Sequence, residues 1–101
     1  MGISRDFGAL LREARSAAGI SQEDLAGGAD LHRTYISMIE RGVRCPTLRV
    51  LFAICYALQI KPASIVTSLE ERVAKRRARE RQRTPINTLA VRTQSFERPP
   101  A

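Results

Sequence analysis

The sequence lacks the residues that most metal and cofactor sites require. It has one histidine and two cysteines, and Cys45 and Cys55 are too far apart in the chain for a Cys-x-x-Cys pair. Two thiols and one imidazole do not make a zinc site, so we expect no metal and no cofactor. Cys55 falls among apolar residues and is expected to be a small buried hydrophobe. A reducing, cytoplasmic setting agrees with this use of cysteine.

Long apolar runs and catalytic constellations are also missing from the sequence. No segment approaches the ~20 consecutive apolar residues that span a bilayer, and the first residues lack the apolar part of a signal peptide. We find no nucleophile beside a base, no carboxylate pair in a plausible cleft and no glycine loop that would hold a phosphate. Membrane-spanning proteins and enzymes are therefore the classes that the sequence argues against.

Acidic residues are scarce relative to basic ones, above all in the C-terminal part. The 101 residues carry a net charge of +7. Residues 1–61 hold 8 Lys/Arg and 6 Asp/Glu, whereas residues 62–101 hold 9 Lys/Arg and 4 Asp/Glu. A basic chain of this size indicates a polyanionic partner, with nucleic acid and an anionic membrane surface as the candidates.

The stretch from residue 20 to residue 41 predicts two short helices joined by a turn. Ser21 and Asp24 fit a capping box, in which each side chain accepts a hydrogen bond from the backbone N–H of the other residue. The first helix is expected to end near Ala26. Residues 27–30 follow with two adjacent glycines, which weaken a helix and permit positive φ.

The second of these helices is expected to run from about His32 to Glu40 and to stop at Gly42, since glycine is favoured just after helix C-termini. Ile36 and Ile39 share its apolar side. The opposite side is short, polar and nearly free of acid, and it consists of Thr34, Ser37, Met38 and Arg41, with Arg33 on the flank. Such a face suits the major groove of DNA, which admits a helix. An ordinary solvated surface is the alternative.

Four segments at fixed spacing resemble the helix-turn-helix family of phage repressors, Cro proteins and xenobiotic-response-element regulators. They are Gln-Glu-Asp-Leu-Ala at 22–26, Thr-Tyr-Ile-Ser at 34–37, Ile-Glu-Arg-Gly at 39–42 and Pro-Thr-Leu at 46–48. The resemblance covers about residues 7–66. It implies an all-α fold, a compact five-helix lambda-repressor-like domain that binds double-stranded DNA and usually works as a homodimer on a two-fold operator. Among such regulators a restriction–modification controller protein is attractive, because nothing in the sequence looks like a ligand-binding domain.

Within this family fold, individual residues can be given expected roles. The candidates for reading base edges are Arg33, Thr34, Ser37 and Met38. The candidates for positioning the protein on phosphates are Ser21, Gln22, Tyr35, Arg41 and Arg44. The resemblance also implies an ion pair between Arg15 and Glu40 that ties the first helix to the end of the recognition helix; in the alternative, both side chains are exposed and unpaired. Two positions depart from the usual pattern, because Asp30 stands where the turn often has glycine and His32 where the recognition helix often has a Ser or Thr cap.

Apolar spacing outlines the other helices of the domain. The first is expected to open at Ser4 and Asp6 and to end at Gly19, and Thr47 is expected to cap another that runs to about Leu58. The expected core residues are Phe7, Leu10, Leu11, Ala14 and Ala18, then Leu25, Ala26, Ala29, Leu31, Ile36 and Ile39, and then Leu48, Leu51, Phe52, Cys55 and Leu58.

A fifth helix is expected from near Pro62 to beyond Glu71. Its apolar residues are candidates for a two-fold contact, although all of them could instead close the core of one protomer; they are Ile65, Val66, Leu69 and Val73. Residues 72–83 hold seven basic residues and one acid, which predicts a charged helical extension that is either solvated or in contact with phosphates.

The expected division of the chain is a DNA-binding domain at 1–69, a basic helical extension at 70–83 and an irregular C-terminal tail at 84–101. Pro85, Pro99 and Pro100 argue against a long helix in the tail, which is expected to be flexible or docked on a protein partner. The alternative function is therefore an antitoxin, or a protein-interaction module, that uses the same fold with a protein partner.

Overall fold

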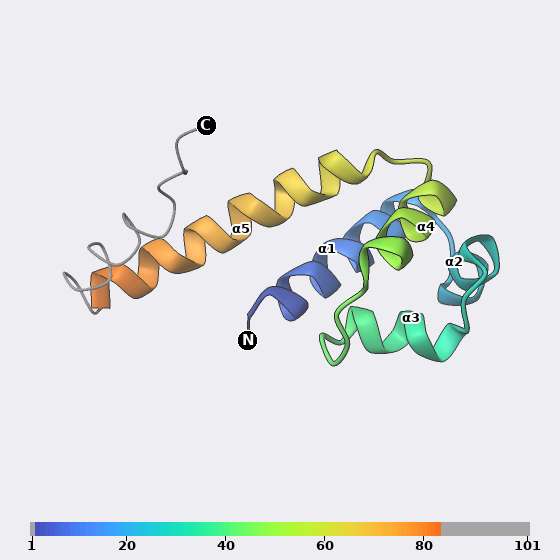
Figure 1. Ribbon diagram of the computed structural model, residues 1–101, viewed down its shortest axis with the longest axis horizontal. Coiled ribbons are helices and arrows are strands. Elements are labelled where there is room, and N and C mark those ends of the chain that lie inside the picture. Colours follow the sequence, from blue (N-terminus) through green and yellow to red (C-terminus); the bar gives the residue numbers. More distant parts are fainter. Residues whose placement is uncertain (1, 84–101) are drawn as a thin grey trace, which may run out of the picture.

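The computed structural model describes residues 2–83, which form five α-helices (Figure 1). The helices are α1 (Ile3–Ala18), α2 (Gln22–Ala29), α3 (Arg33–Glu40), α4 (Leu48–Leu58) and α5 (Pro62–Arg83). The prediction of an all-α, five-helix fold is confirmed. The expected tail at 84–101, and the protein partner suggested for it, lie outside the described residues.

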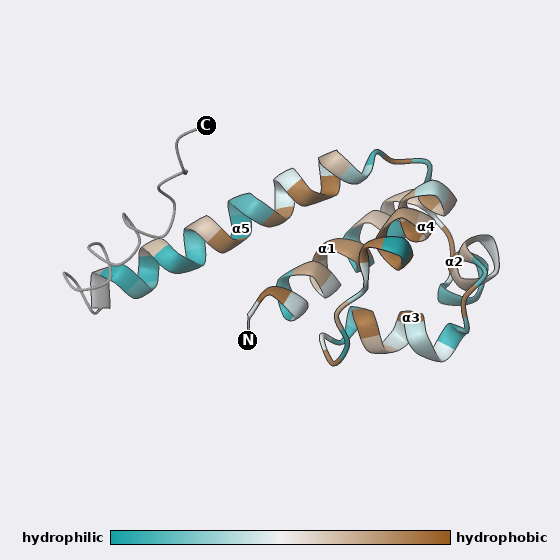
Figure 2. Cartoon of the chain, in the orientation of Figure 1, coloured by the Kyte–Doolittle hydropathy of each residue, from teal (hydrophilic) through white to brown (hydrophobic). Residues whose placement is uncertain are grey.

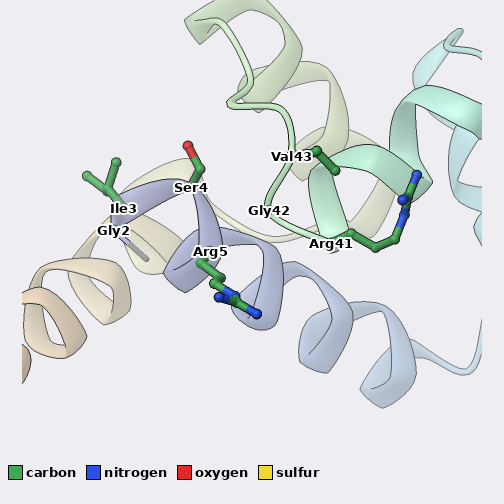
Figure 3. Close-up of a pocket in the computed structure, with 7 residues that line it drawn as sticks. All are labelled: Gly2, Ile3, Ser4, Arg5, Arg41, Gly42 and Val43. Carbon is green, nitrogen blue, oxygen red and sulfur yellow. The ribbon is translucent and has the colours of Figure 1, made fainter.

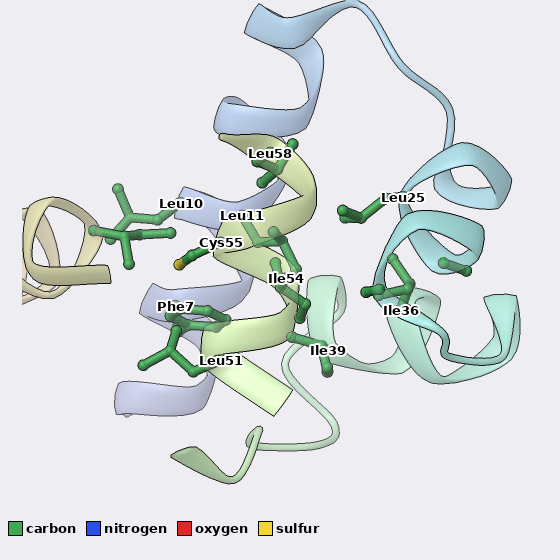
Figure 4. Packing of buried hydrophobic residues seen from close by; sticks show 13 residues of the cluster. Phe7, Leu10, Leu11, Leu25, Ile36, Ile39, Leu51, Ile54, Cys55 and Leu58 are labelled. Carbon is green, nitrogen blue, oxygen red and sulfur yellow. The ribbon is translucent and has the colours of Figure 1, made fainter. Parts of the chain in front are cut away.

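The core fills the space between the first four helices, and α5 closes it from one side. The largest fully buried side chains within residues 2–81 are Leu11, Leu25, Ile36, Ile39, Ile54 and Cys55. Figure 4 shows the buried cluster directed into the space that α1, α2, α3 and α4 enclose. Each buried aliphatic side chain of this kind contributes roughly 1.5–3 kcal/mol, so this cluster is the main source of the fold's stability.

Close contact between α1 and α3 depends on Gly8, which is buried in the middle of α1. A Cβ at this position would meet the carbonyl oxygen of Ile39 and would lie 2.7 Å from the carbonyl oxygen of Glu40. Only a residue without a side chain allows this approach. The sequence gives no periodic signal for this role, although a glycine within a helical pattern often marks such packing.

The helix α2 extends three residues beyond its predicted end at Ala26. Gly27 and Gly28 are both helical, and the chain turns only at Asp30, which adopts a left-handed conformation with φ 58°. A Cβ at Gly28 would lie 3.2 Å from the Cβ of Ala57, so this glycine lets α2 pack closely against α4. The prediction of a break at the glycines is wrong, because this packing outweighs the low helix propensity of glycine.

The inward face of α4 also differs from the prediction. Leu51, Ile54, Cys55 and Leu58 are buried, whereas Leu48 is 75% exposed and Phe52 is 45% exposed. Almost every residue of α4 is apolar, so apolar spacing could not select which side faces the core. The same kind of correction applies to Ala18, which is exposed in the last turn of α1.

The long helix α5 runs antiparallel to α1 and changes character along its length. Its first half contributes Ile65 to the core, and its second half is strongly hydrophilic (Figure 2). Arg72 donates to both carboxylate oxygens of Glu13 at 2.7 Å, and Arg76 pairs with Asp6. The basic extension is therefore helical, as predicted, and as far as Arg76 it is held against α1.

Two observations describe what residues 2–83 do not contain. No single helix among them is long and apolar enough to cross a membrane, and α4 and α5 meet those criteria only when taken together across a bend of 112°. The same residues include no group of three or more His, Cys, Asp or Glu side chains that could hold a metal ion.

Candidate nucleic-acid interface

Local hydrogen bonds fix where the two helices of the central motif begin. The backbone N–H of Asp24 donates to Ser21 Oγ at 3.0 Å, and the N–H of Ser21 donates to Asp24 Oδ2 at 3.3 Å. This is the predicted capping box, and it starts α2. At the start of α3, the N–H of Thr34 donates to His32 Nδ1 at 3.2 Å, so His32 caps the helix in place of the more usual Ser or Thr.

The turn between α2 and α3 is closed by backbone bonds around Asp30. The N–H of Leu31 donates to the carbonyl oxygen of Ala26 at 2.8 Å, which satisfies a terminal acceptor of α2. Aspartate tolerates the left-handed conformation better than most residues, so it can serve where many sequences would use glycine. The two helices thereby form a rigid corner, as α3 packs against both α1 and α2.

The corner leaves one face of α3 uncovered. Ile36 and Ile39 are fully buried, and they anchor the helix to the core. The four predicted base-reading residues lie on the outer side, where Arg33 and Thr34 are exposed and Ser37 and Met38 are half-buried. This face carries no acidic side chain, because the single acid of α3, Glu40, is turned inward. A polyanion could therefore approach it without repulsion.

Glu40 is held by a network that joins three helices. Arg15 of α1 donates to it twice, from Nε to Oε2 at 2.6 Å and from Nη2 to Oε1 at 3.1 Å. Gln22 of α2 adds a third bond from Nε2 to Oε1 at 3.0 Å. The side chain of Glu40 is 3% exposed and that of Arg15 is 15% exposed. The ion pair implied by the resemblance is therefore present and almost fully enclosed.

The charges in this network stabilise each other. Burial by itself would raise the pKa of Glu40, but the hydrogen bonds from Arg15 and Gln22 and the positive charges of Arg15 and Arg12 outweigh burial and lower that pKa. The hydrogen bond to Glu40 raises the pKa of Arg15. Both groups are consequently charged at neutral pH.

Gln22 has a contact inside the protein that the sequence did not predict. We expected its side chain to contact a phosphate or a base edge, and in the structure its amide is bonded to Glu40. The other Nε2 hydrogen and the amide oxygen form no hydrogen bond within residues 2–83. Gln22 can therefore face a ligand only through those remaining atoms, or by giving up its bond to Glu40.

Basic residues surround the C-terminal end of α3. The guanidinium carbon of Arg44 lies 5.8 Å from the centroid of the Tyr35 ring, which places the cation over the aromatic face. Arg41 is exposed beside a hollow of about 350 Å³ between the first turn of α1 and the loop after α3. Figure 3 shows that Arg5 and Arg41 line this hollow but point in different directions, so they do not converge on one ligand.

Some of the apolar residues expected at a two-fold contact are buried in the structure, and the others are accessible. Ile65 is 5% exposed and belongs to the core, and Leu69 packs against that core. Val66 is 45% exposed and Val73 is half-buried, so these two remain candidates.

A larger exposed apolar stripe lies on α4 and was not predicted from the sequence. Leu48, Phe52 and Tyr56 follow each other at four-residue spacing and are 75%, 45% and 72% exposed. The rings of Phe52 and Tyr56 meet edge to face with centroids 6.4 Å apart. These three side chains are called the α4 stripe below.

Comparisons with known proteins agree with this architecture. A helix-turn-helix family model matches residues 11–65. The chain is 46% identical over 61 residues to the control protein C.BamHI of Bacillus amyloliquefaciens, a match that covers 59% of this chain and 75% of that protein. It is also similar to the crystal structure of the restriction-modification controller protein C.AhdI from Aeromonas hydrophila, with a TM-score of 0.60 and 40% identity. That match covers 61% of this chain and 94% of the C.AhdI chain. The structure of the clp gene regulator ClgR from Corynebacterium glutamicum gives a TM-score of 0.72 at 25% identity, over 83% of this chain and 89% of that one.

Proposed function

The chain belongs to the helix-turn-helix family, and on that premise we propose that it is a sequence-specific regulator of transcription that binds double-stranded DNA as a homodimer on a palindromic operator. The observation that carries this proposal is the uncovered, acid-free face of α3. Its helix is anchored by Ile36 and Ile39, so the outer side chains are presented on a rigid support. In the proposed complex, α3 lies in the major groove.

The chemistry of the exposed residues suits base recognition. Arg33 can donate two parallel hydrogen bonds to the O6 and N7 atoms of guanine. Thr34 and Ser37 can exchange hydrogen bonds with base edges, and the methyl group of Thr34 can contact the methyl group of thymine. Met38 adds an apolar contact at the inner edge of the same face. These contacts would determine which sequence is bound.

The residues around the face suit contacts that position the protein. Arg41 and Arg44 supply positive charge near the end of α3, and the ring of Tyr35 holds the Arg44 guanidinium in place. Phosphate contacts of this kind fix register and orientation without reading sequence. The residues assigned to them are Ser21, Gln22, Tyr35, Arg41 and Arg44.

The proposal is tested by selecting bound sequences from a random duplex pool and measuring affinities for the selected site. Arg33→Ala should lose about 1–3 kcal/mol on that site and much less on random DNA. Arg77→Ala is the matched control, because Arg77 is an exposed arginine on α5 and lies outside the proposed face. Equal losses for Arg33→Ala on selected and random DNA would remove Arg33 from base reading, and a pool without enrichment would refute sequence-specific binding.

We place the two-fold contact on the α4 stripe. Three neighbouring apolar side chains exposed on one helix are costly to leave in water, and a patch that meets its own copy across a two-fold axis buries them in pairs. Phe52→Asp should convert a dimer to a monomer in sedimentation equilibrium. Val66→Asp is the comparison, because Val66 is equally exposed at 45% and lies on α5. Dissociation by Val66→Asp alone would move the contact to α5, where the sequence predicted it.

The specific role that we favour is that of a restriction–modification controller. The support is the similarity to C.BamHI and C.AhdI, at 46% and 40% identity. A controller that regulates its own synthesis should bind the DNA that precedes its own coding sequence. Footprinting on that DNA tests the role, and protection elsewhere with none there would contradict it.

A further inference from the structure

The second half of α5 borders a hollow that the helix-turn-helix motif does not use. The hollow has a volume of about 330 Å³ and is lined by Asp6 of α1 and by Arg72, Lys75, Arg76 and Arg79 of α5. Its α5 residues lie beyond the segment 11–65 that matches the family. α1 lies between α3 and α5, so this hollow and the proposed DNA-reading face are on different sides of α1 (Figure 1).

The four cations reach the hollow because of their spacing. Residues 72, 75, 76 and 79 are separated by three, one and three positions, which places them on one face of a helix. That face is turned to α1 by Ile65 and Leu69, which occupy the same side of α5 two turns and one turn before Arg72; Ile65 is buried in the core and Leu69 packs against it. The cations are therefore gathered by the same packing that holds α5 in place.

Only part of this positive charge is neutralised by the protein. Arg72 is paired with Glu13, and Arg76 is paired with Asp6. Lys75 and Arg79 are exposed, and no ion pair or hydrogen bond within residues 2–83 involves their side chains. Arg72 and Arg76 are meanwhile held in fixed positions, with 38% and 27% of their side chains exposed. The hollow thus combines two fixed cations with two unpaired ones.

We propose that this hollow binds a phosphate group through Lys75 and Arg79, with Arg76 lining the same hollow. Arginine presents a planar fork of donors that matches phosphate oxygens, and lysine adds a compact charge that can approach the same group. A phosphate carries enough negative charge to balance the two unpaired cations. The chemistry is common to the backbone of DNA and to a free phosphorylated ligand.

The first experiment uses the full chain and inorganic pyrophosphate as the probe. Backbone amide resonances are followed by NMR during a titration at constant ionic strength, with chloride as the balancing anion. We expect saturable shifts at residues 75–79, and the double variant Lys75→Gln/Arg79→Gln should weaken binding by at least roughly tenfold. The matched control is Arg77→Gln/Arg81→Gln, which removes the same charge from the same helix at residues that do not line the hollow.

The second experiment identifies the source of the phosphate. Affinity for a random duplex is measured against salt concentration for both double variants. A phosphate contact contributes about 0.9 to the slope of log K against log salt concentration. A slope lowered by about one unit in Lys75→Gln/Arg79→Gln, but not in the control, assigns the hollow to the DNA backbone. An unchanged slope together with lost pyrophosphate binding assigns it to a free phosphorylated ligand.

Two results would overturn the site. One is the absence of saturable pyrophosphate binding, and the other is equal behaviour of the two double variants in both experiments, which would mean that the charge of α5 acts diffusely. The pyrophosphate experiment does not depend on α3, because it needs no DNA. Conversely, sequence preference in the random pool should be retained by Lys75→Gln/Arg79→Gln and weakened by Arg33→Ala, so failures of the two proposals are distinguishable.

Discussion

Glu40→Gln is the substitution that most directly tests how α1, α2 and α3 are held together. Glutamine has nearly the same shape as glutamate, so the change removes the charge without leaving a cavity. It also places an amide N–H₂ group beside the donors of Arg15 and Gln22, where the structure has carboxylate oxygens at 2.6–3.1 Å. The guanidinium of Arg15 would then be left without its counter-charge.

The size of the effect follows from the burial of the pair. Removing one member of a buried ion pair costs roughly 3–5 kcal/mol, because an uncompensated charge remains. Glu40 is 3% exposed, whereas Arg15 retains 15% and can be partly solvated, so we expect about 2–4 kcal/mol. In a small domain each kcal/mol lowers the melting temperature by ~4–8 °C, so the melting temperature should fall by roughly 8–32 °C.

The assay is urea unfolding of wild type and variant at a series of pH values. The pKa of Glu40 is lowered in the folded state, so its ion pair stabilises the fold above the unfolded pKa, near 4.5, and this contribution is lost as the pH falls through the lowered value. The difference in the free energy of unfolding between wild type and Glu40→Gln should therefore be largest at pH 7 and should shrink at pH values below 4.5.

A matched control is available on the same helix bundle. Glu13 also pairs with an arginine, but its side chain is 60% exposed and that of Arg72 is 38% exposed. Glu13→Gln should cost less than ~1 kcal/mol, as exposed pairs do. If Glu13→Gln and Glu40→Gln cost the same, or if the cost of Glu40→Gln did not change with pH, the reasoning from burial would be refuted.

Three further predictions concern packing, thiol reactivity and phosphate contact. Gly8→Ala should destabilise the fold by about 1–3 kcal/mol, because the new Cβ would meet two carbonyl oxygens of α3. Gly27→Ala should instead stabilise the fold by about 0.5–1 kcal/mol, since a Cβ there has no neighbour within 4 Å. Urea unfolding of both variants measures the two changes in the free energy of unfolding. Cys45 is exposed and should react with a thiol reagent in the folded protein, whereas burial raises the pKa of Cys55 and should delay its reaction until unfolding; two equal fast phases would contradict this. Arg44→Ala should weaken binding to every DNA sequence and lower the salt slope by about one unit, and an unchanged slope would rule out that phosphate contact.

Features that depend on neighbours in the chain could be predicted from the sequence. The capping box of Ser21 and Asp24, the cap at Thr47 and the start of α5 at Pro62 are all present where expected. Each of them is decided by hydrogen bonds or backbone restrictions within about four residues. The buried face of α3 was also predictable, because Ile36 and Ile39 stand among polar residues and leave one choice of inward side.

The ion pair between Arg15 and Glu40 was predictable for a different reason. Twenty-five residues separate the two side chains, so nothing local connects them. The resemblance to a known family supplied the expectation, and the structure supplied the geometry. The further bond from Gln22 to Glu40 was not expected, since sequence alone does not show that three helices converge on one carboxylate.

Other features were decided only when the helices packed. Apart from Arg49, α4 has apolar or aromatic residues on every side, so apolar spacing did not select its buried face, and Leu48 and Phe52 were misplaced. The two glycines of α2 favour a break by local propensity, yet close packing against α4 keeps them helical. The basic hollow of α5 likewise exists because α1 lies beside it. The sequence by itself determined that these helices form and where α2, α4 and α5 begin, since those energies are local. The start of α1 was misplaced, because its N-cap is Gly2 without a side-chain cap. Tertiary structure decided which faces meet, because burial depends on the shape of the partner surface. Residues from several helices form that surface, so no single segment of the sequence predicts its shape.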